Sequence, residues 1–352
     1  MKASHLLSGI AFFVLATIRA VAIGATYTPY VLGTGTANDI NSSRTVIGQI
    51  YTTNGGYVFS AFSYSGGVLV NLGTLAGDTD SGASAINDSG VIVGTSSNPN
   101  TAVRGIRYSG GVMSAINGGA PYTYASGIDD SGVIVGETGA APVAFVNNGG
   151  VVTTLGTLGG PYSGAAAINN SGTVVGRADV TPSLTHAFRY AGGVMTDLGG
   201  LFSAGNPSYA WDINDAGIIV GDSIVNGYSR AFRYNASVMT ALPTPNVFHS
   251  TAEAINSAGL IVGSYTAPSP FRDHAALWDG DTLIDLAPYL DQIGLTGWNS
   301  RAMGINDNGD IVGDAWDVHY NHRAFLLAVP EPSPMLLLIV GLAVLGQAVR
   351  AR

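Results

Sequence analysis

Residues 86–94 read Ile86-Asn87-Asp88-Ser89-Gly90-Val91-Ile92-Val93-Gly94, and close copies of this nonapeptide bring its occurrences to seven. The copies begin 40 to 50 residues apart, at Ile40, Ile86, Ile128, Ile168, Ile213, Ile255 and Ile305. A period of this length is typical of repeat architectures that build each unit from about four short strands. The sequence therefore predicts one structural unit that is copied around most of the protein.

A second phrase alternates with the nonapeptide, and its fullest form is His186-Ala187-Phe188-Arg189-Tyr190. Most of its copies precede a Gly-Gly turn and a strand that ends near Leu-Gly. Each unit thus contains two hairpins, because Asn and Gly supply the backbone conformations that tight turns require. Four strands in each of seven units predict an all-β fold, a seven-bladed β-propeller of four-stranded antiparallel blades. No helix is evident within the repeats.

The ends of the array bear on how the ring closes. An open β-solenoid is the rival architecture, but it should carry polar capping units, and none is apparent. The array begins with a fourth-strand segment at residues 27–32 and ends with a third-strand segment at residues 324–328. This offset favours a blade shared between the two ends, which would close the ring with hydrogen bonds. Seven complete blades that start on the fourth-strand segment stay open as the alternative.

Composition limits the classes of function. Residues 26–329 hold ten arginines, no lysine and 22 acidic residues, which is a net charge of −12. Such an acidic body argues against nucleic acid, whose phosphates need a basic face. The chain has no cysteine, which excludes disulfides and thiolate metal sites. Glycine is abundant at 49 residues and charged residues make up only 11%, as expected of a turn-rich β protein.

Both ends of the chain carry address signals. Residues 1–25 have a basic start, an apolar run from Leu6 to Ile18 and small residues, which together predict a secretory signal peptide. An N-terminal membrane anchor is the alternative, although the apolar run is short for a span. Residues 330–352 contain Pro330-Glu331-Pro332, an apolar segment at 335–349 and a tail with Arg350 and Arg352. This order predicts a single hydrophobic helix with its basic end in the cytoplasm.

These features resemble two known families. The C-terminal segment resembles the PEP-CTERM sorting signal, and residues 27–328 resemble the HAF repeat of extracellular proteins, whose His-Ala-Phe triplet is intact only at residues 186–188. The resemblance implies use of the secretion machinery, transient membrane anchoring through 335–349 and cleavage near Pro330 to Pro332 by an exosortase-type enzyme. It further implies display at the cell surface or release, in bacteria that make exopolysaccharide. An ordinary tail anchor is the alternative, and the HAF resemblance carries no established activity.

Metal sites have weak signals in the sequence, and no cofactor is predicted. The Asn-Asp-Ser-Gly turns and the pairs Asp78/Asp80 and Asp279/Asp281 offer oxygen ligands, but each turn is too short to complete a calcium shell. Plain turn chemistry is therefore the favoured interpretation. The densest polar group lies in the last unit, where carboxylates and imidazoles suggest a divalent metal site without matching any known spacing: Asp314, Asp317, His319 and His322.

Interruptions of the repeat are the better pointers to a ligand. Residues 264–274 and 287–300 depart from the repeat and bring aromatic side chains that can stack on sugar rings: Tyr265, Phe271, Tyr289 and Trp298. Packing over the end of the ring is the alternative for these residues. The preferred hypothesis is a non-enzymatic surface or matrix protein that binds exopolysaccharide or neighbouring proteins weakly. The alternative is a propeller glycosidase or lyase, which would need unrepeated carboxylates converging at one mouth of the channel.

Overall fold

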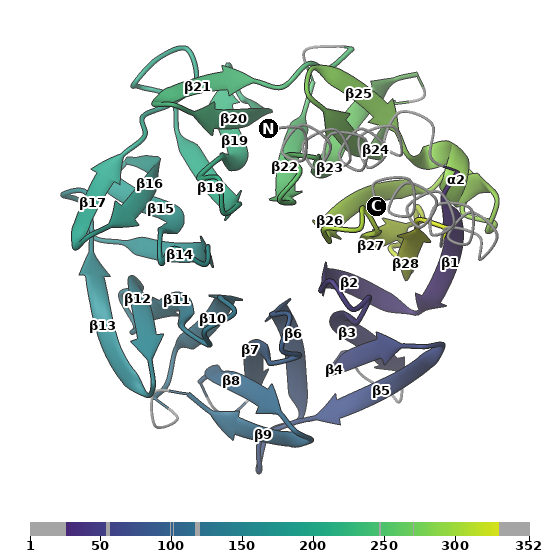
Figure 1. The fold of residues 1–352 in the computed structure, drawn as a ribbon, viewed down its shortest axis with the longest axis horizontal. Coiled ribbons are helices and arrows are strands. Elements are labelled where there is room, and N and C mark those ends of the chain that lie inside the picture. The colour runs from purple at the N-terminus through teal and green to yellow at the C-terminus, as the bar shows by residue number, and fades with distance from the viewer. Residues whose placement is uncertain are drawn as a thin grey trace, which may run out of the picture.

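The computed structural model arranges its strands in seven four-stranded antiparallel sheets, set radially around a central channel (Figure 1). The structure describes residues 26–53, 57–98, 100, 102–116, 120–245, 248–269 and 271–330. The predicted seven-bladed β-propeller is therefore confirmed. We number the blades 1 to 7 in the chain order of their innermost strands.

Blades 1 to 3 each run from the innermost to the outermost strand in chain order. Blade 1 consists of β2 (Gly35–Ile40), β3 (Val46–Thr53), β4 (Tyr57–Ser65) and β5 (Val68–Gly73). Blade 2 consists of β6 (Asp80–Ile86), β7 (Ile92–Ser97), β8 (Arg104–Ser109) and β9 (Val112–Ala115). Blade 3 consists of β10 (Thr123–Ile128), β11 (Ile134–Thr138), β12 (Val143–Asn148) and β13 (Val151–Gly156).

Blades 4 to 6 repeat this order. Blade 4 consists of β14 (Ser163–Ile168), β15 (Val174–Thr181), β16 (Leu184–Ala191) and β17 (Val194–Asp197). Blade 5 consists of β18 (Ser208–Ile213), β19 (Ile219–Val225), β20 (Tyr228–Asn235) and β21 (Val238–Ala241). Blade 6 consists of β22 (Ser250–Ile255), β23 (Ile261–Pro268), β24 (Phe271–Asp279) and β25 (Thr282–Asp285). The short helix α2 (Ala287–Asp291) follows, although no helix was predicted within the repeats.

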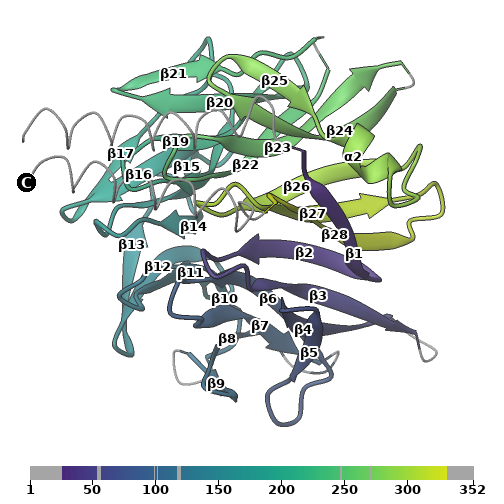
Figure 2. The same ribbon diagram turned by 45° about the vertical axis from the view of Figure 1, so that its right-hand side comes forward.

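Blade 7 takes strands from both ends of the described chain. It consists of β26 (Asn299–Ile305), β27 (Ile311–Trp316), β28 (His322–Ala328) and, outermost, β1 (Thr28–Gly33). Strand β1 pairs antiparallel with β28, so that Thr28 lies opposite Ala328 and Tyr30 opposite Leu326 (Figure 2). The shared blade is thus the closure that the structure adopts, and it joins the two ends of the array by backbone hydrogen bonds.

Every innermost strand carries one β-bulge, always just before the Ile-Asn pair. In blade 4 the register shifts between Ala165 and Ala167, which lie opposite Gly176 and Val175. A Cβ on Gly176 would collide with the Gly164 carbonyl oxygen and stand only 2.8 Å from Cα of Ala165. The final glycines of the other six nonapeptides meet the same obstacle: Gly48, Gly94, Gly136, Gly221, Gly263 and Gly313. The bulge therefore explains why the nonapeptide ends in glycine.

The asparagine at the second position of the nonapeptide forms hydrogen bonds both within its own turn and to the next blade. Asn169 Oδ1 accepts the backbone N–H of Thr173 at 3.0 Å and closes its own turn. Its Nδ2 donates to the carbonyl oxygen of Asn214, in the next blade, at 3.0 Å. The turn bond recurs in all seven blades, and the bond to the next blade recurs at every position that has an asparagine. Blade 3 has Asp129 at this position, and a carboxylate has no N–H to donate.

Neighbouring blades pack face to face through a repeated apolar set. Phe188 is fully buried and packs with Val174 of its own blade and with Val135 and Ala144 of blade 3. Small alanines on the facing strands let the large phenylalanines fit between two sheets at native packing density. The core is therefore a series of seven inter-blade clusters, not one central cluster, because the axis of the ring is a channel.

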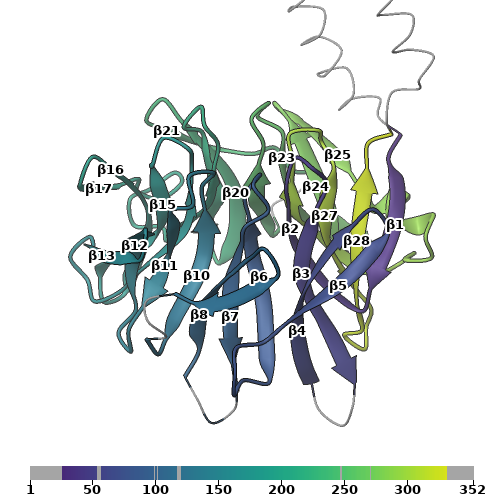
Figure 3. The same cartoon turned by 60° about the horizontal axis from the view of Figure 1, so that its bottom comes forward.

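The two faces of the ring differ in their connections. Antiparallel order places the Asn-x-x-Gly turns and the Gly-Gly turns on one face, which we call the turn face. The hairpins between second and third strands and the connections between blades lie on the other, which we call the loop face (Figure 3). Because β28 runs toward the turn face and β1 runs away from it, residues 28 and 328 both lie at the turn face.

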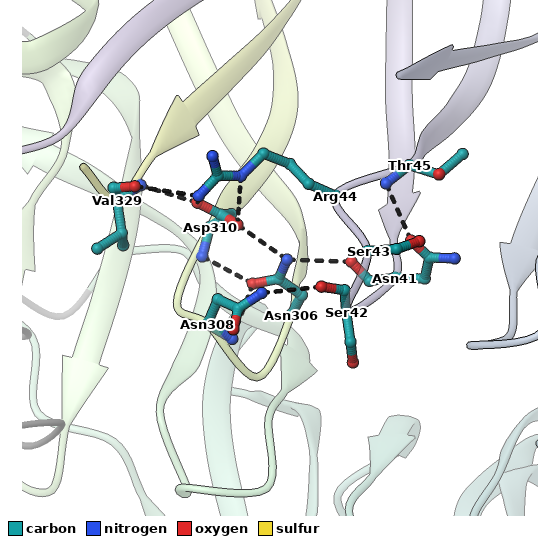
Figure 4. Close-up of polar contacts among 9 residues, drawn as sticks. All are labelled: Asn41, Ser42, Ser43, Arg44, Thr45, Asn306, Asn308, Asp310 and Val329. Carbon is teal, nitrogen blue, oxygen red and sulfur yellow. Dashed lines mark hydrogen bonds and ion pairs between the residues drawn. The ribbon is translucent and has the colours of Figure 1, made fainter. Parts of the chain in front are cut away.

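An ion pair links blades 1 and 7 at the seam where the ends of the array meet (Figure 4). Arg44 Nε and Nη2 donate to the two carboxylate oxygens of Asp310 at 2.9 and 3.0 Å. Arg44 Nη2 also donates to the Val329 carbonyl, and Asp310 accepts the Val329 backbone N–H at 2.8 Å. Both partners are unrepeated, because the other six turns have glycine at the Arg44 position and uncharged residues at the Asp310 position. Arg44 adopts the left-handed conformation that glycine adopts elsewhere, with φ 61°.

The predicted terminal segments lie outside the described residues. This applies to the signal peptide at 1–25, to the hydrophobic helix at 335–349, and to Glu331, Pro332, Arg350 and Arg352 of the sorting signal. Of that signal only Pro330 is described, and it directly follows Val329. Within the described ranges, no helix has the length and apolar character needed to span a membrane.

Candidate functional site

The channel mouth at the turn face is built from repeated residues. It is lined by the first three residues of all seven nonapeptides, which begin with Ile-Asn in six blades and with Ile128-Asp129 in blade 3. The following residues bond from blade to blade, since the backbone N–H of Ser42 donates to Asp88 at 2.9 Å and that of Asp88 donates to Asp130 at 3.0 Å. Many of the polar groups at this mouth thus hold neighbouring blades together, which favours a structural role for it.

Deeper in the channel, the repeat breaks down at one position. The extra residue of each bulge stands two before the isoleucine, and all seven extra residues line one cavity of about 170 Å³. We call this set the bulge ring: Asn38, Ser84, Ser126, Ala166, Trp211, Glu253 and Met303. A bulge re-aims a side chain away from the regular alternation of the strand. The bulge ring therefore places seven different side chains around the axis of an otherwise repetitive scaffold.

Trp211 is held firmly in the bulge ring. Its indole Nε1–H donates to Asp222 at 2.7 Å, and its ring lies nearly parallel to that of Tyr209, with centroids 6.0 Å apart. Asp222 is buried, and burial raises the pKa of its carboxyl, while the bond from Trp211 opposes this. Because Nε1 is the only polar atom of an indole, Trp211 offers the cavity a fixed carbon surface.

Two of the three carboxyl groups that line the cavity are occupied by the backbone. Asp39 accepts the N–H groups of Ile40 at 2.8 Å and of Ile86, in the next blade, at 2.9 Å. Asp212 accepts those of Ile213 at 2.7 Å and Ile255 at 2.8 Å in the same way. Burial raises the pKa of Asp39 to about 6 and that of Asp212 to about 7. These two carboxyls act as clamps between blades, and both of their oxygens are already engaged.

Glu253 is the third carboxyl. Unlike Asp39 and Asp212, it accepts no hydrogen bond from a backbone N–H of the described residues. Burial is the main cause that raises the pKa of its carboxyl, while Arg301 and a bond with the Thr251 hydroxyl lower it. Asp222 and Asp314 raise the pKa further through their negative charge. Glu253 is therefore a desolvated carboxyl whose side chain faces the open cavity.

The clamps predict that acid stabilises the ring. Asp39 and Asp212 bind a proton more tightly in the folded state than in the unfolded chain, because their folded pKa lies above the usual 3.8. The contribution of the clamps to the free energy of unfolding should therefore be largest below about pH 4 and should be lost as the pH rises through 6 and 7. We expect a loss of at least about 1 kcal/mol between pH 5 and pH 8, since one pKa unit corresponds to about 1.4 kcal/mol.

Thermal unfolding across this pH range, in the parent and in an Asp39→Asn/Asp212→Asn variant, measures the effect. His274 has a raised pKa through its bond to Asp285 and adds a loss of the same sign, so the difference between the two proteins isolates the clamps. A parent that gains stability from pH 5 to pH 8, or a variant with an undiminished slope, would contradict the assignment.

The predicted metal-site residues do not converge. Asp314 is buried and accepts His322 Nδ1 at 2.9 Å and Arg301 Nη2 at 3.4 Å. Asp317 and His319 instead lie in the exposed β27–β28 connection, where Asp317 Oδ1 accepts the backbone N–H groups of His319 and Asn321. In the described ranges, no group of three His, Cys, Asp or Glu side chains is placed to hold a metal ion.

The candidate calcium turns already use their oxygens. In the Asn-x-x-Gly turns the Asn or Asp at the second position of each nonapeptide accepts a turn N–H in every blade, as Asn169 does. Asp80 accepts the backbone N–H of Phe59 at 3.0 Å, and Asp78 forms an ion pair with Arg104 at 2.7 Å. Asp281 faces Arg233 at 3.6 Å. Turn bonds, hydrogen bonds and ion pairs thus engage oxygens of Asp78, Asp80 and Asp281.

The predicted loop aromatics mostly pack onto the ring. Residues 264–274 extend the β23–β24 hairpin, and Tyr265 is buried there with its ring edge against His274. Tyr289 of α2 contacts Tyr27 edge to face at 5.2 Å, and Trp298 packs against the same core cluster. The 287–300 insertion therefore packs beside strand β1 and covers the core cluster between blades 6 and 7. Phe271 is the exception, because 68% of it is exposed.

Sequence reasoning missed the bulge ring. The signal was present, since each unit keeps alanine three residues before the isoleucine but varies freely at the next position. Its detection required knowledge that a bulge turns this one residue into the channel. The loop-face end of blade 7 adds a second unrepeated group, in which Arg301 lies 5.9 Å from the Trp316 ring and Trp316 stacks on His322.

No protein-family model matches this chain, and no curated protein matches it. Among solved structures, it is similar to the β-propeller domain of the Trilobed protease from Pyrococcus furiosus, with 10% identity over 87% of this chain and 100% of that chain and a TM-score of 0.55. That domain has an open velcro topology, whereas this chain closes its ring through β1 and β28. Looser similarities are found to TolB from Acinetobacter baumannii (12% identity, 86% and 97% coverage, TM-score 0.47) and to the Aleuria aurantia lectin (10%, 87% and 99%, 0.40). The similarity to the protease domain shows the propeller fold alone.

Proposed function

We propose that this chain is an exported surface or matrix protein whose propeller binds saccharide at the bulge ring without turning it over. The observation that carries the proposal is that the residue at the bulge position differs from blade to blade. Trp211, Glu253 and Asn38 line a cavity there together with small residues. Carbon surface from an aromatic ring together with a few fixed polar groups is what a saccharide site requires. The cavity is below the range of about 300–1,000 Å³ of drug-sized sites, so it would hold one terminal sugar group.

Binding is favoured over hydrolysis because of how the carboxyls are used. Both glycosidase mechanisms need two carboxyl groups that flank the scissile bond. Glu253, with its raised pKa, meets the requirement for an acid, and this is the specific observation in favour of the alternative, a propeller glycosidase or lyase. Asp39 and Asp212 are the other carboxyls of the cavity, and backbone N–H groups occupy both oxygens of each. A second catalytic carboxyl is therefore not provided by the cavity lining.

The proposed location follows from the terminal segments. The resemblance to the PEP-CTERM signal and the HAF repeat supports export, sorting by an exosortase-type enzyme and association with exopolysaccharide. Strand β28 delivers Val329 and Pro330 at the turn face, so an anchor that follows them would hold the turn face toward the membrane. The loop face would then point away from the membrane.

A glycan array probed with residues 26–329 tests the proposal, because this range holds every strand of all seven blades. We expect binding to a limited set of glycans, no product by mass spectrometry after prolonged incubation, and loss of at least tenfold in affinity in Trp211→Ala. Phe202→Ala removes a ring that is 77% exposed on a blade connection and should bind as the parent does. Released product would favour the enzyme, and loss of binding in Phe271→Ala but not in Trp211→Ala would move the site to the loops.

A further inference from the structure

The charge of the bulge ring selects among saccharides. The ionisable groups that act on Glu253 are Arg301, Asp222 and Asp314, and the cavity itself adds Asp39 and Asp212. Arg301 is the one cation in this set, and its Nη2 faces Asp314 at 3.4 Å. Carboxyls therefore outnumber cations around the cavity, in a body whose net charge is −12 over residues 26–329. A negative interior of this kind attracts cations and repels a ligand that carries a carboxylate or sulfate.

Glu253 also has unused capacity to accept hydrogen bonds. A carboxylate offers about four acceptor sites, and the Thr251 hydroxyl is the hydrogen-bond partner that the structure gives it. Its pKa is raised mainly because burial disfavours the charge. A cation that entered the cavity would stabilise the ionised form, so the cost of desolvating Glu253 would be recovered when the ligand binds.

The apolar part of the cavity lining suits the same ligand. Trp211 has committed its N–H to Asp222 and presents carbon surface, and the indole is the aromatic ring that attracts an ammonium group best. Met303 adds a polarizable thioether to the same cavity. A metal ion is disfavoured, since no three ligating side chains of the described ranges are suitably placed. The lining thus combines one open carboxyl with an aromatic surface, which is the chemistry that recognises an organic ammonium group.

We propose that the bulge ring binds the primary ammonium group of an amino sugar, with Glu253 as its acceptor and Trp211 beneath the sugar ring. The inference rests on the proposed saccharide binding and names its ligand class. Asn38, Ser84 and Ser126 line the remainder of the cavity and offer hydrogen-bond partners to the sugar hydroxyls. The ligand would be the exposed end of a partly deacetylated polysaccharide, because a cavity of about 170 Å³ cannot take a long chain.

Calorimetric titration of the whole ring with matched oligosaccharides tests the inference. The probes are a glucosamine tetramer, the N-acetylglucosamine tetramer and butylamine, each at low salt and in 0.5 M NaCl. We expect the glucosamine tetramer to bind at least tenfold more tightly than its N-acetylated counterpart, and high salt to reduce this preference. In Glu253→Gln the two tetramers should bind equally, while the melting temperature does not fall, because the substitution removes a carboxyl that burial disfavours.

The outcomes separate the two proposals. Equal binding of both tetramers by the parent, or a preference that survives Glu253→Gln, overturns ammonium recognition and leaves saccharide binding intact. Butylamine that binds as tightly as the glucosamine tetramer overturns the assignment to a sugar. A chain that binds neither these tetramers nor any glycan on the array contradicts the proposed function, and the further inference with it.

Discussion

Gly176→Ala should destabilise the propeller more than any other single methyl group added to blade 4. Its Cβ would collide with the Gly164 carbonyl oxygen across the bulge and stand 2.8 Å from Cα of Ala165, and both obstacles are backbone. Neither can move without breaking the pairing of β14 and β15 or shifting the ring of bulge residues. We expect the free energy of unfolding to fall by about 3 kcal/mol or more, toward the upper end of overpacking effects.

Gly172→Ala in the same nonapeptide is the matched control. Gly172 has φ 77° and open space where its Cβ would be, so alanine there meets backbone strain but no collision. The expected cost is about 1–2 kcal/mol. Chemical denaturation of both variants gives the comparison. Gly176→Ala that unfolds like the parent, or that costs less than Gly172→Ala, would mean that the bulge is absent or placed elsewhere.

Asp310→Ala should open the seam between blades 1 and 7. The buried carboxylate accepts Arg44 Nε and Nη2, Asn306 Nδ2 and the Val329 backbone N–H, at 2.8–3.0 Å. Its removal leaves these donors without their acceptor in a largely buried setting. Loss of one partner from a buried ion pair costs about 3–5 kcal/mol, and we expect about 3 kcal/mol because Arg44 is 31% exposed.

A double-mutant cycle separates the ion pair from general damage at the seam. Arg44→Gly restores the residue that the other six turns carry and relieves a left-handed backbone, but it leaves Asp310 buried without its cation. Arg44→Gly/Asp310→Val gives the seam the residues that Gly132 of blade 3 and Val91 of blade 2 supply at an equivalent interface. Equilibrium unfolding should show the double variant to be more stable than the single variants Asp310→Val and Arg44→Gly. Strictly additive losses would show that Arg44 and Asp310 do not interact.

The fold was largely predictable because each unit contains recognisable turn residues. The asparagine and glycine of Asn-x-x-Gly act within one hairpin, so the sequence reveals them locally. The offset between residues 27–32 and 324–328 was visible, but local pattern alone does not say whether two strands about 300 residues apart pair. The second role of the asparagine, a bond to the next blade as from Asn169 to Asn214, is non-local and was not foreseen.

The candidate site was less predictable, for a related reason. Departures from the repeat in length, such as 287–300, are easy to see, yet Tyr289 and Trp298 pack against the core cluster between blades 6 and 7. Changes of residue type at constant repeat length, such as Trp211 and Glu253, leave the period unchanged. They are therefore not visible as interruptions of the repeat. Their convergence depends on the bulge and on the closure of the ring, and both are properties of the assembled sheets. The variable position directly after the constant alanine was the signal in the sequence.

Closure through the shared blade is the central claim, since the channel, the seam and the bulge ring all depend on it. The chain has no cysteine, so a Thr28→Cys/Ala328→Cys variant carries a single pair of thiols. Directly opposed residues of an antiparallel pair lie within the Cα separation that a disulfide accepts. We predict that mild oxidation yields a nearly complete intramolecular disulfide by mass spectrometry, whereas Thr28→Cys/Ala241→Cys, whose second thiol is on blade 5, yields none. Free thiols or disulfide-linked dimers in the first variant would contradict a ring closed by β1 and β28.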